Sequence, residues 1–146
     1  MASMDHSAFE KEIRSQFRDI IETNGFEVHY SDNAFKILEL VNAKCIVRFI
    51  DDWGLIVCDF ADPVEKRYRE SLPGKGVGPA GYPIYPASMV WRFLYSNDKK
   101  DYNYGYEETG KQVRAIKSLL VERLARVLEG DFSWAKDLRQ TDEKSL

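Results

Sequence analysis

Four aspartates are the residues whose type and spacing first suggest chemistry: Asp51, Asp52, Asp59 and Asp62. Calcium and magnesium sites need several oxygen ligands that converge on one point. The surrounding pattern predicts a hairpin, which places the first two carboxylates at its tip and the other two near its far end. Their spacing does not match an EF-hand loop either. We therefore predict no metal site, and we expect a solvated sheet edge and a helix cap instead.

The chain has two histidines and two cysteines. Neither His6 nor His29 has a cysteine or a second histidine at zinc-ligand spacing. A nucleophilic triad would have to combine His29 with Cys45 or a serine, and sequence order alone leaves that combination open. Cys45 lies within a predicted strand, however, where thiols are usually inert. We predict no catalytic residue.

Residues 73–86 hold four of the five prolines and four of the nine glycines. This composition opposes a helix or a central strand, and a long irregular loop inside a domain is usually functional or disordered. The segment from Gly76 to Gly81 matches the G-x-G-x-x-G pattern of dinucleotide sites. No strand precedes it, and Pro79 removes an amide that would hold a phosphate. We predict no cofactor.

Aromatic residues are concentrated just after this loop, from position 82 to position 106. Tyrosine and tryptophan are favoured at recognition surfaces because they offer much contact area for little side-chain entropy. We expect Trp91 and Phe93 to build a core layer, whereas the loop tyrosines are divided evenly between recognition and structure. The predicted partner-binding residues are Tyr82, Tyr85, Tyr102, Tyr104 and Tyr106, together with Asp51, Asp52 and Trp53 at the hairpin tip.

Composition limits the class of protein. A chain of 146 residues fits one globular domain, which we assign to 1–146 with frayed ends at 1–6 and 140–146. The net charge of −3 argues against nucleic-acid binding. No apolar run approaches the roughly 18 residues of a membrane span. No secretory signal is visible and no Cys-x-x-Cys pattern occurs, so we expect a cytoplasmic protein.

Hydrophobic periodicity predicts the elements of the first half. A capping box from Ser7 to Glu10 begins a helix that ends at Asn24 and Gly25. A period of two then predicts an antiparallel meander with strands at 26–31, 34–41, 44–51 and 55–61. We expect turns at 32–33, 42–43 and 51–54. This alignment points one set of residues toward the helix: Phe26, Val28, Tyr30, Phe35, Ile37, Ile46, Ile50, Ile56 and Phe60.

The opposite face of this predicted sheet is apolar over its last three strands, where it includes Leu38, Leu40, Cys45, Val47, Phe49, Leu55 and Val57. A patch of this size requires a cover, either the C-terminal half or a partner. The same alignment pairs Glu39 with Arg48 as diagonal neighbours. It also places Cys45 and Cys58 on opposite faces, which predicts two free thiols.

The C-terminal half is predicted to be helical. We expect helices from Asp62 to Glu70, from Pro86 through Leu94, and from a second capping box at Thr109 to Glu129, followed by a short helix through Leu138. The fold class is therefore α+β: an N-terminal helix on a four-stranded antiparallel meander, followed by a helical C-terminal half.

The first 60 or so residues resemble small bacterial toxin-immunity proteins in format. The features that carry the resemblance are the helix ending Asn24-Gly25-Phe26 and the meander segments 35–40 and 48–57. The resemblance implies tight binding of a secreted toxin's catalytic domain. Binders of this kind commonly present acidic and aromatic side chains to a basic partner.

Three functions remain open from the sequence. The first is a non-catalytic protein-binding domain, as the resemblance implies. The second is a small enzyme or small-ligand-binding protein, with a pocket between the 73–86 loop and the sheet lined by Arg48, Asp59, Tyr82, Tyr85 and Tyr102. The third is a homodimer that uses the second face of the sheet.

Overall fold

The computed structural model describes residues 2–32, 35–64 and 84–144. Several predictions therefore lie outside the described residues. These are the conformation of the loop at 73–83 with its dinucleotide-like pattern, the position of Tyr82, and the greater part of the helix predicted from Asp62 to Glu70.

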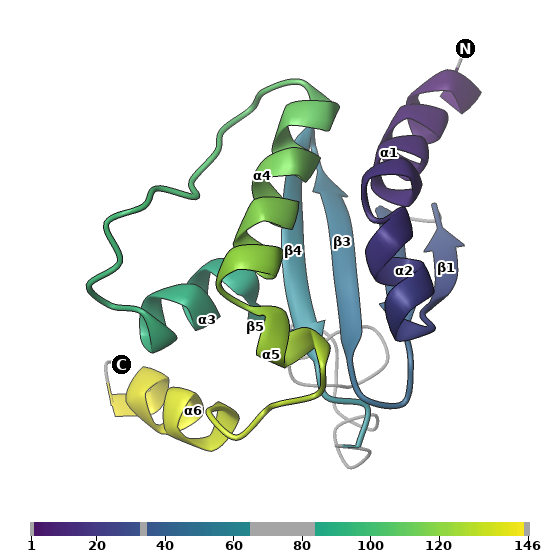
Figure 1. The fold of residues 1–146 in the computed structure, drawn as a ribbon. Coiled ribbons are helices and arrows are strands. Elements are labelled where there is room, and N and C mark those ends of the chain that lie inside the picture. Colours follow the sequence, from purple (N-terminus) through teal and green to yellow (C-terminus); the bar gives the residue numbers. More distant parts are fainter. Residues whose placement is uncertain (1, 33–34, 65–83, 145–146) are drawn as a thin grey trace.

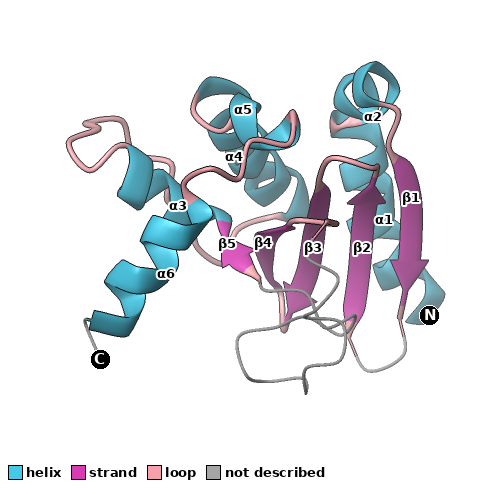
Figure 2. Ribbon diagram, turned by 90° about the horizontal axis from the view of Figure 1, so that it is seen from below, coloured by secondary structure: helices cyan, strands magenta, loops and turns pink. Residues whose placement is uncertain are grey.

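One antiparallel sheet forms the centre of the fold (Figure 2). Its strands are β1 (Glu27–Ser31), β2 (Lys36–Val41), β3 (Ile46–Asp52), β4 (Leu55–Ala61) and β5 (Tyr85–Pro86). Their spatial order follows the sequence, so the first four form the predicted meander. The additional strand β5 pairs only with Asp59 and Phe60 of β4. The beginning of β4, from Leu55 to Cys58, has no strand partner on its outer edge among the described residues.

The helices lie on one face of the sheet and at its β5 edge (Figure 1). They are α1 (Ala2–Gln16), α2 (Arg18–Asn24), α3 (Ala87–Leu94), α4 (Thr109–Glu122), α5 (Ala125–Leu128) and α6 (Ala135–Lys144). Helices α1, α2 and α4 cover the same face, whereas α3 and α6 lie beside β5 (Figures 1 and 2). The predicted α+β fold class is confirmed.

The helix-covered face of the sheet is not the one predicted. In β2 and β3 the residues that face the helices are Leu38, Leu40, Val47 and Phe49, and all four are fully buried. The residues of these two strands that were predicted to face the helices, Ile37, Ile46 and Ile50, point the other way. Phe35, which was also predicted to be buried there, is 48% exposed. Leu38, Leu40, Val47 and Phe49 are therefore covered by helices and are not available for a homodimer contact.

Two turns explain this inversion. Trp53 and Gly54 alone connect β3 to β4, because Asp52 pairs with Leu55, whereas the prediction had a bulged turn. Four residues, 32–35, separate β1 from β2, whereas the prediction had two. Each difference shifts the pairing by an odd number of residues and so exchanges the faces. The remaining residues of the predicted set do face the helices: Phe26, Val28 and Tyr30 before and within β1, and Ile56 and Phe60 in β4.

The β2–β3 connection is also longer than predicted, but its error does not exchange faces. Val41 pairs with Ile46, so residues 42–45 form the turn in place of 42–43. The side chain of Asn42 accepts hydrogen bonds from the backbone N–H groups of Lys44 and Cys45, both at 2.8 Å. These bonds explain why a four-residue turn is stable here.

Helix boundaries differ from prediction where capping was inferred. Helix α1 already begins at Ala2, so Ser7 lies inside it and the first capping box is wrong. Phe17 separates α1 from α2, and Gly25 ends α2 with φ 62°, as predicted for a glycine C-cap. The long helix predicted to reach Glu129 is divided into α4 and α5. The ends predicted as frayed are helical as far as they are described.

Both cysteines are free, as predicted, and the structure places both in buried positions, but the geometric reason for the prediction is wrong. Cys45 and Cys58 do not lie on opposite sides of the sheet, since both belong to the large core cluster beneath the helices. Burial raises the pKa of each thiol well above its ordinary value. Both side chains are therefore uncharged core residues.

Candidate functional site

The hairpin that joins β3 to β4 ends in an unusual turn. Trp53 has φ 54° and Gly54 has φ 96°. Positive φ at both positions matches the two-residue hairpin turn in which asparagine, aspartate and glycine are preferred. Trp53 is the only non-glycine residue with positive φ in the part of the chain that the structure describes. The side chain of Asp51 stabilises the turn by accepting the backbone N–H of Gly54 at 2.9 Å.

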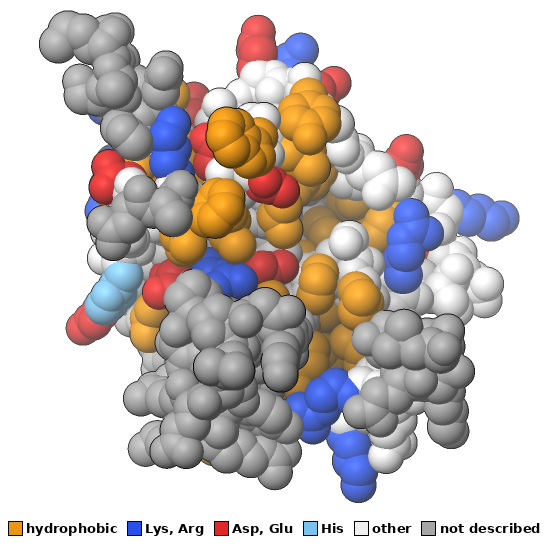
Figure 3. All heavy atoms as spheres, turned by 180° about the vertical axis from the view of Figure 1, so that it is seen from behind, with side chains coloured by type: hydrophobic (Ala, Val, Ile, Leu, Met, Phe, Trp, Pro, Cys, Tyr) orange, Lys and Arg blue, Asp and Glu red, His pale blue; other side chains and the backbone are white. Residues whose placement is uncertain are grey.

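Exposed aromatic side chains gather around this turn. Trp53 is 88% exposed, Tyr106 is 74% exposed and Phe35 is about half exposed. Trp53 and Phe35 line one shallow hollow of about 300 Å³, together with Lys36, Asp51 and Gly54. From behind the sheet, hydrophobic side chains gather over the upper half of the molecule with acidic side chains between them (Figure 3).

The segment before α4 lies against the same turn. A Cβ placed on Gly54 would lie 3.8 Å from the ring of Tyr106. The side-chain amide nitrogen of Gln112 donates to the carbonyl oxygens of both Gly54 and Glu107, at 2.8 Å each. Two segments that are far apart in the sequence thus meet at the tip of the hairpin.

The electrostatics of this end are acidic. Lys36 and Asp51 form an ion pair at 3.8 Å and neutralise each other. The carboxylates of Asp52 and Glu107 have no side-chain hydrogen bond or ion pair within the described ranges, and both residues are exposed. We define the hairpin-tip surface as Phe35, Asp52, Trp53, Tyr106 and Glu107. It combines three exposed aromatic rings with two unpaired negative charges.

The other predicted contact tyrosines are placed differently. Tyr85 is buried, its ring packs edge-on against Trp134 at 5.1 Å, and its hydroxyl accepts a hydrogen bond from Arg139. Tyr102 is also buried, and Tyr104 is half-buried with its hydroxyl donating to the carbonyl of Ile56. These three rings leave little surface for a partner.

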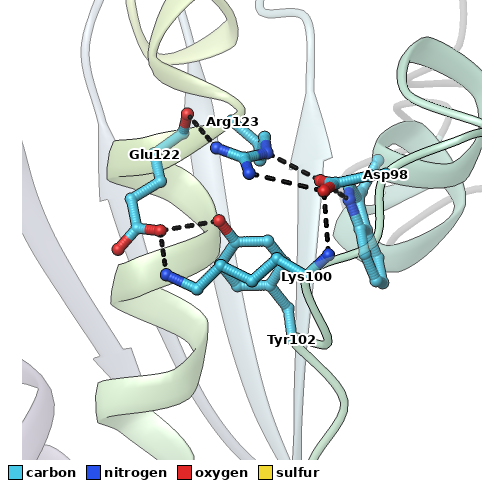
Figure 4. A network of polar contacts seen from close by, with 6 residues as sticks. Asp98, Lys100, Tyr102, Glu122 and Arg123 are labelled. Carbon is cyan, nitrogen blue, oxygen red and sulfur yellow. Dashed lines mark hydrogen bonds and ion pairs between the residues drawn. The ribbon is translucent and has the colours of Figure 1, made fainter.

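A polar network explains why Tyr102 is held in place (Figure 4). Its hydroxyl donates to Glu122 at 2.7 Å, and the Lys100 ammonium pairs with the same carboxylate. Arg123 donates through Nε to Asp98 at 2.6 Å, and its guanidinium lies 5.4 Å from the centre of the Tyr102 ring. The network joins the loop after α3 to the end of α4.

Asp98 is the centre of this network. It also accepts the indole N–H of Trp91 at 2.9 Å and the backbone N–H of Lys100 at 3.1 Å. The hydrogen bonds from Arg123 and Trp91 hold the pKa of Asp98 far below its usual range. The hydrogen bond from Lys100 likewise lowers the pKa of Glu122. All the charged groups pair with each other, so the network is structural.

A small pocket of about 230 Å³ lies between β4, the start of α3 and the segment at 102–104. Of the described residues predicted to line a ligand site, Tyr102 lines this pocket, whereas Arg48, Asp59 and Tyr85 do not. Its tyrosine hydroxyls are already bonded to Glu122 and to the Ile56 carbonyl. Ligand pockets usually measure about 300–1,000 Å³ and offer convergent polar groups. This pocket therefore gives little support to an enzyme or a ligand-binding protein.

Arg48 and Asp59 lie opposite each other in the register, on the sheet face away from the helices. Both are buried and their side chains pair at 3.2 Å. Arg48 thus pairs with Asp59. Glu39 lies on the same face as Arg48, as predicted, but directly opposite it and not diagonally, and no ion pair between these two side chains is found among the described residues. Burial raises the pKa of Asp59, although the Arg48 charge opposes this effect. The Nε atom of Arg48 is buried and has no hydrogen-bond partner among the residues that the structure describes.

The candidate triad residues are not brought together. His29 is exposed on β1 with Glu27 at 3.3 Å, on the sheet face away from the helices. Cys45 is fully buried in the core beneath the helices. Within the described residues, no group of three or more His, Cys, Asp or Glu side chains is placed to hold a metal ion.

Comparison with known proteins adds no identity. No family model, no curated protein and no solved structure matches the chain. None of the helices in the described part combines the length and the apolar character needed to cross a membrane.

Sequence reasoning found part of the hairpin-tip surface and missed the rest. Asp52, Trp53 and Tyr106 were among the predicted contact residues. Phe35 was assigned to the core because the β1–β2 turn was placed wrongly. Glu107 carries no recognisable signal in the sequence, because its position depends on Gln112, a contact that only the folded chain creates.

Proposed function

We propose that this protein is a non-catalytic binding domain that docks on a basic protein partner through the hairpin-tip surface. The observation that carries the proposal is Trp53. A bulky side chain in the left-handed region costs about 1–2 kcal/mol, and a ring that is 88% exposed recovers little of this by packing. Strained residues of this kind are concentrated at functional sites.

The chemistry of the surface indicates the kind of partner. Tryptophan and tyrosine dominate the binding energy of many protein interfaces. The unpaired carboxylates of Asp52 and Glu107 favour a partner with lysine or arginine side chains, which can also stack on an exposed ring. The hollow beside Trp53 is shallow, which suits a protein surface better than a small molecule.

A toxin that the chain neutralises in the cytoplasm is the specific partner that we propose. Two features support it: the resemblance of the first 60 residues to toxin-immunity proteins, and an acidic aromatic surface of the kind that such binders present. A basic catalytic domain would be steered toward this surface, which raises the association rate.

The test begins with the gene immediately upstream of this one. Its product is purified, and its affinity for this chain is measured with Trp53→Ala and Tyr106→Ala variants. Met89→Ala and Tyr95→Ala, exposed hydrophobic residues elsewhere on the molecule, serve as controls. We expect each tip variant to weaken binding about 30-fold, as truncation of a central aromatic residue does. The controls should bind like the native chain.

Two results would contradict the proposal. If the upstream product binds and the tip variants bind as well as the controls, the contact surface lies elsewhere. If that product neither binds nor inhibits growth when expressed without this chain, the assignment to toxin neutralisation is wrong. Sedimentation at two concentrations separately tests the homodimer alternative.

A further inference from the structure

We propose that Gln112 is a positioning residue that holds the hairpin-tip surface in its binding conformation, by replacing a missing neighbour strand along the outer edge of β4. The functional meaning of this inference rests on the proposed binding role. The positioning itself is a property of the free protein.

The outer edge of β4 shows why such a residue is needed. Strand β5 pairs with Asp59 and Phe60 only, so the edge near the turn has no backbone partner among the described residues. Unpaired backbone groups at a sheet edge are costly when buried and invite other strands to pair. Gln112 accepts the N–H of Ile56 and donates to the carbonyl of Gly54, each at 2.8 Å.

Tyr104 supplies the remaining hydrogen bond that a neighbouring strand would otherwise make with Ile56. Its hydroxyl donates to the carbonyl oxygen of Ile56. The N–H and C=O of Ile56 and the C=O of Gly54 are thus all bonded to side chains, one from the loop that follows α3 and one from α4. Gln112 is only 1% exposed, so water does not compete for these bonds.

Gln112 also couples the two halves of the surface. Its amide nitrogen donates to Gly54 and to Glu107. Gly54 directly follows Trp53, and Glu107 directly follows Tyr106. One buried nitrogen therefore ties the backbone beside Trp53 to the backbone beside Tyr106, the two residues that carry the most exposed rings of the surface. Because a surface that is already ordered loses less conformational entropy on binding, Gln112 should strengthen affinity without touching the partner.

Two substitutions separate the roles of this side chain. Gln112→Met keeps the length of the side chain and removes all three hydrogen bonds. Gln112→Glu keeps an acceptor for the Ile56 N–H but places a carboxylate against the two carbonyl oxygens. Val113→Ala, at the next and fully buried position of α4, is the control for a general loss of stability.

Amide hydrogen exchange and backbone NMR relaxation of the free protein give the readout. In Gln112→Met, the Ile56 amide should exchange about tenfold faster than the global loss of stability explains, which corresponds to one lost hydrogen bond. Gly54 and Glu107 should become mobile in the same variant. In Gln112→Glu, the Ile56 amide should stay protected while Gly54 and Glu107 become mobile. Val113→Ala should change all amides in proportion to stability.

The positioning proposal is overturned if Gly54 and Glu107 stay as rigid in both Gln112 variants as in Val113→Ala, or if the Ile56 amide exchanges no faster in Gln112→Met. The binding proposal would be unaffected by that result. If the tip loosens and an established partner still binds with native affinity, positioning is upheld for the free protein and the hairpin-tip surface is not the contact surface.

Discussion

Replacing Trp53 by asparagine should stabilise the protein and weaken its binding at the same time. Asparagine adopts the left-handed conformation readily, and Asn-Gly is a preferred pair for a two-residue hairpin turn. Trp53 holds φ 54° at the corresponding position, directly before Gly54. The substitution therefore removes backbone strain from the folded state and leaves the turn type unchanged.

The size of the gain follows from two opposing terms. Relief of the left-handed conformation contributes about 1–2 kcal/mol. The ring is 88% exposed, so its loss removes only about 30 Å² of buried surface, or about 0.7 kcal/mol at 25 cal/mol per Å². The net stabilisation is about 1 kcal/mol, which raises Tm by about 3 °C for a chain of this size.

Thermal and urea denaturation followed by circular dichroism measure this change. Trp53→Ala is the matched control, because it removes the same ring but introduces no residue that prefers the left-handed region. It should be no more stable than the native chain. A Trp53→Asn variant with an unchanged or lower Tm would refute the strain argument. A variant that is stabilised and binds the partner normally would refute the role of the ring in binding.

Three further predictions concern buried and charged groups. Arg48→Leu should destabilise the fold by about 3 kcal/mol or more, because it leaves the Asp59 carboxylate buried without its counter-charge. In urea denaturation, the double variant with Asp59→Leu should recover most of the lost stability, and additive losses would contradict the pairing. Because the pKa of Asp98 is lowered in the folded state, its carboxylate stabilises the fold at pH values above the ordinary aspartate pKa of about 3.9. This stabilisation is lost as the pH falls from there toward the pKa of the folded state. Asp98→Asn should therefore lose less stability than the native chain between neutral pH and about pH 3, and equal losses would contradict the role of this carboxylate. Cys45 and Cys58 should react with a thiol reagent only as the chain unfolds, and fast labelling of the native protein would show that either thiol is accessible.

The sequence predicts the first four strands of this fold to within about two residues, but it misses β5 and assigns the wrong buried face to β2 and β3. In β2 and β3, adjacent residues such as Leu38 and Ile37, or Phe49 and Ile50, are equally hydrophobic. Periodicity therefore could not distinguish the two faces, and only the turns could do so. The β3–β4 turn contains a tryptophan at a position where glycine or asparagine is expected, so the rule that normally identifies such turns failed there.

The candidate site was partly predictable for a related reason. Local signals identify an exposed hairpin tip with acidic and aromatic residues, and Asp52 and Trp53 are found there. The Thr-x-x-Gln pattern from Thr109 to Gln112, before an apolar run, predicts that Gln112 belongs to a helix cap. Two of its three hydrogen-bond partners, Gly54 and Ile56, are more than fifty positions away. No local pattern encodes a contact of that range.

The aromatic residues of this protein thus fall into two groups that composition alone does not separate. The rings of Tyr102 and Tyr85 pack inside the fold and their hydroxyls are hydrogen-bonded there, as expected of residues that build structure. Trp53 differs from them, because its backbone is strained and its ring lies in solvent. A local rule that is broken without gain to the folded state is typical of functional positions. Because a buried side chain holds the strained turn in place, the hairpin tip is a fixed feature of the fold, and its exposed ring is the basis of the binding role that we propose.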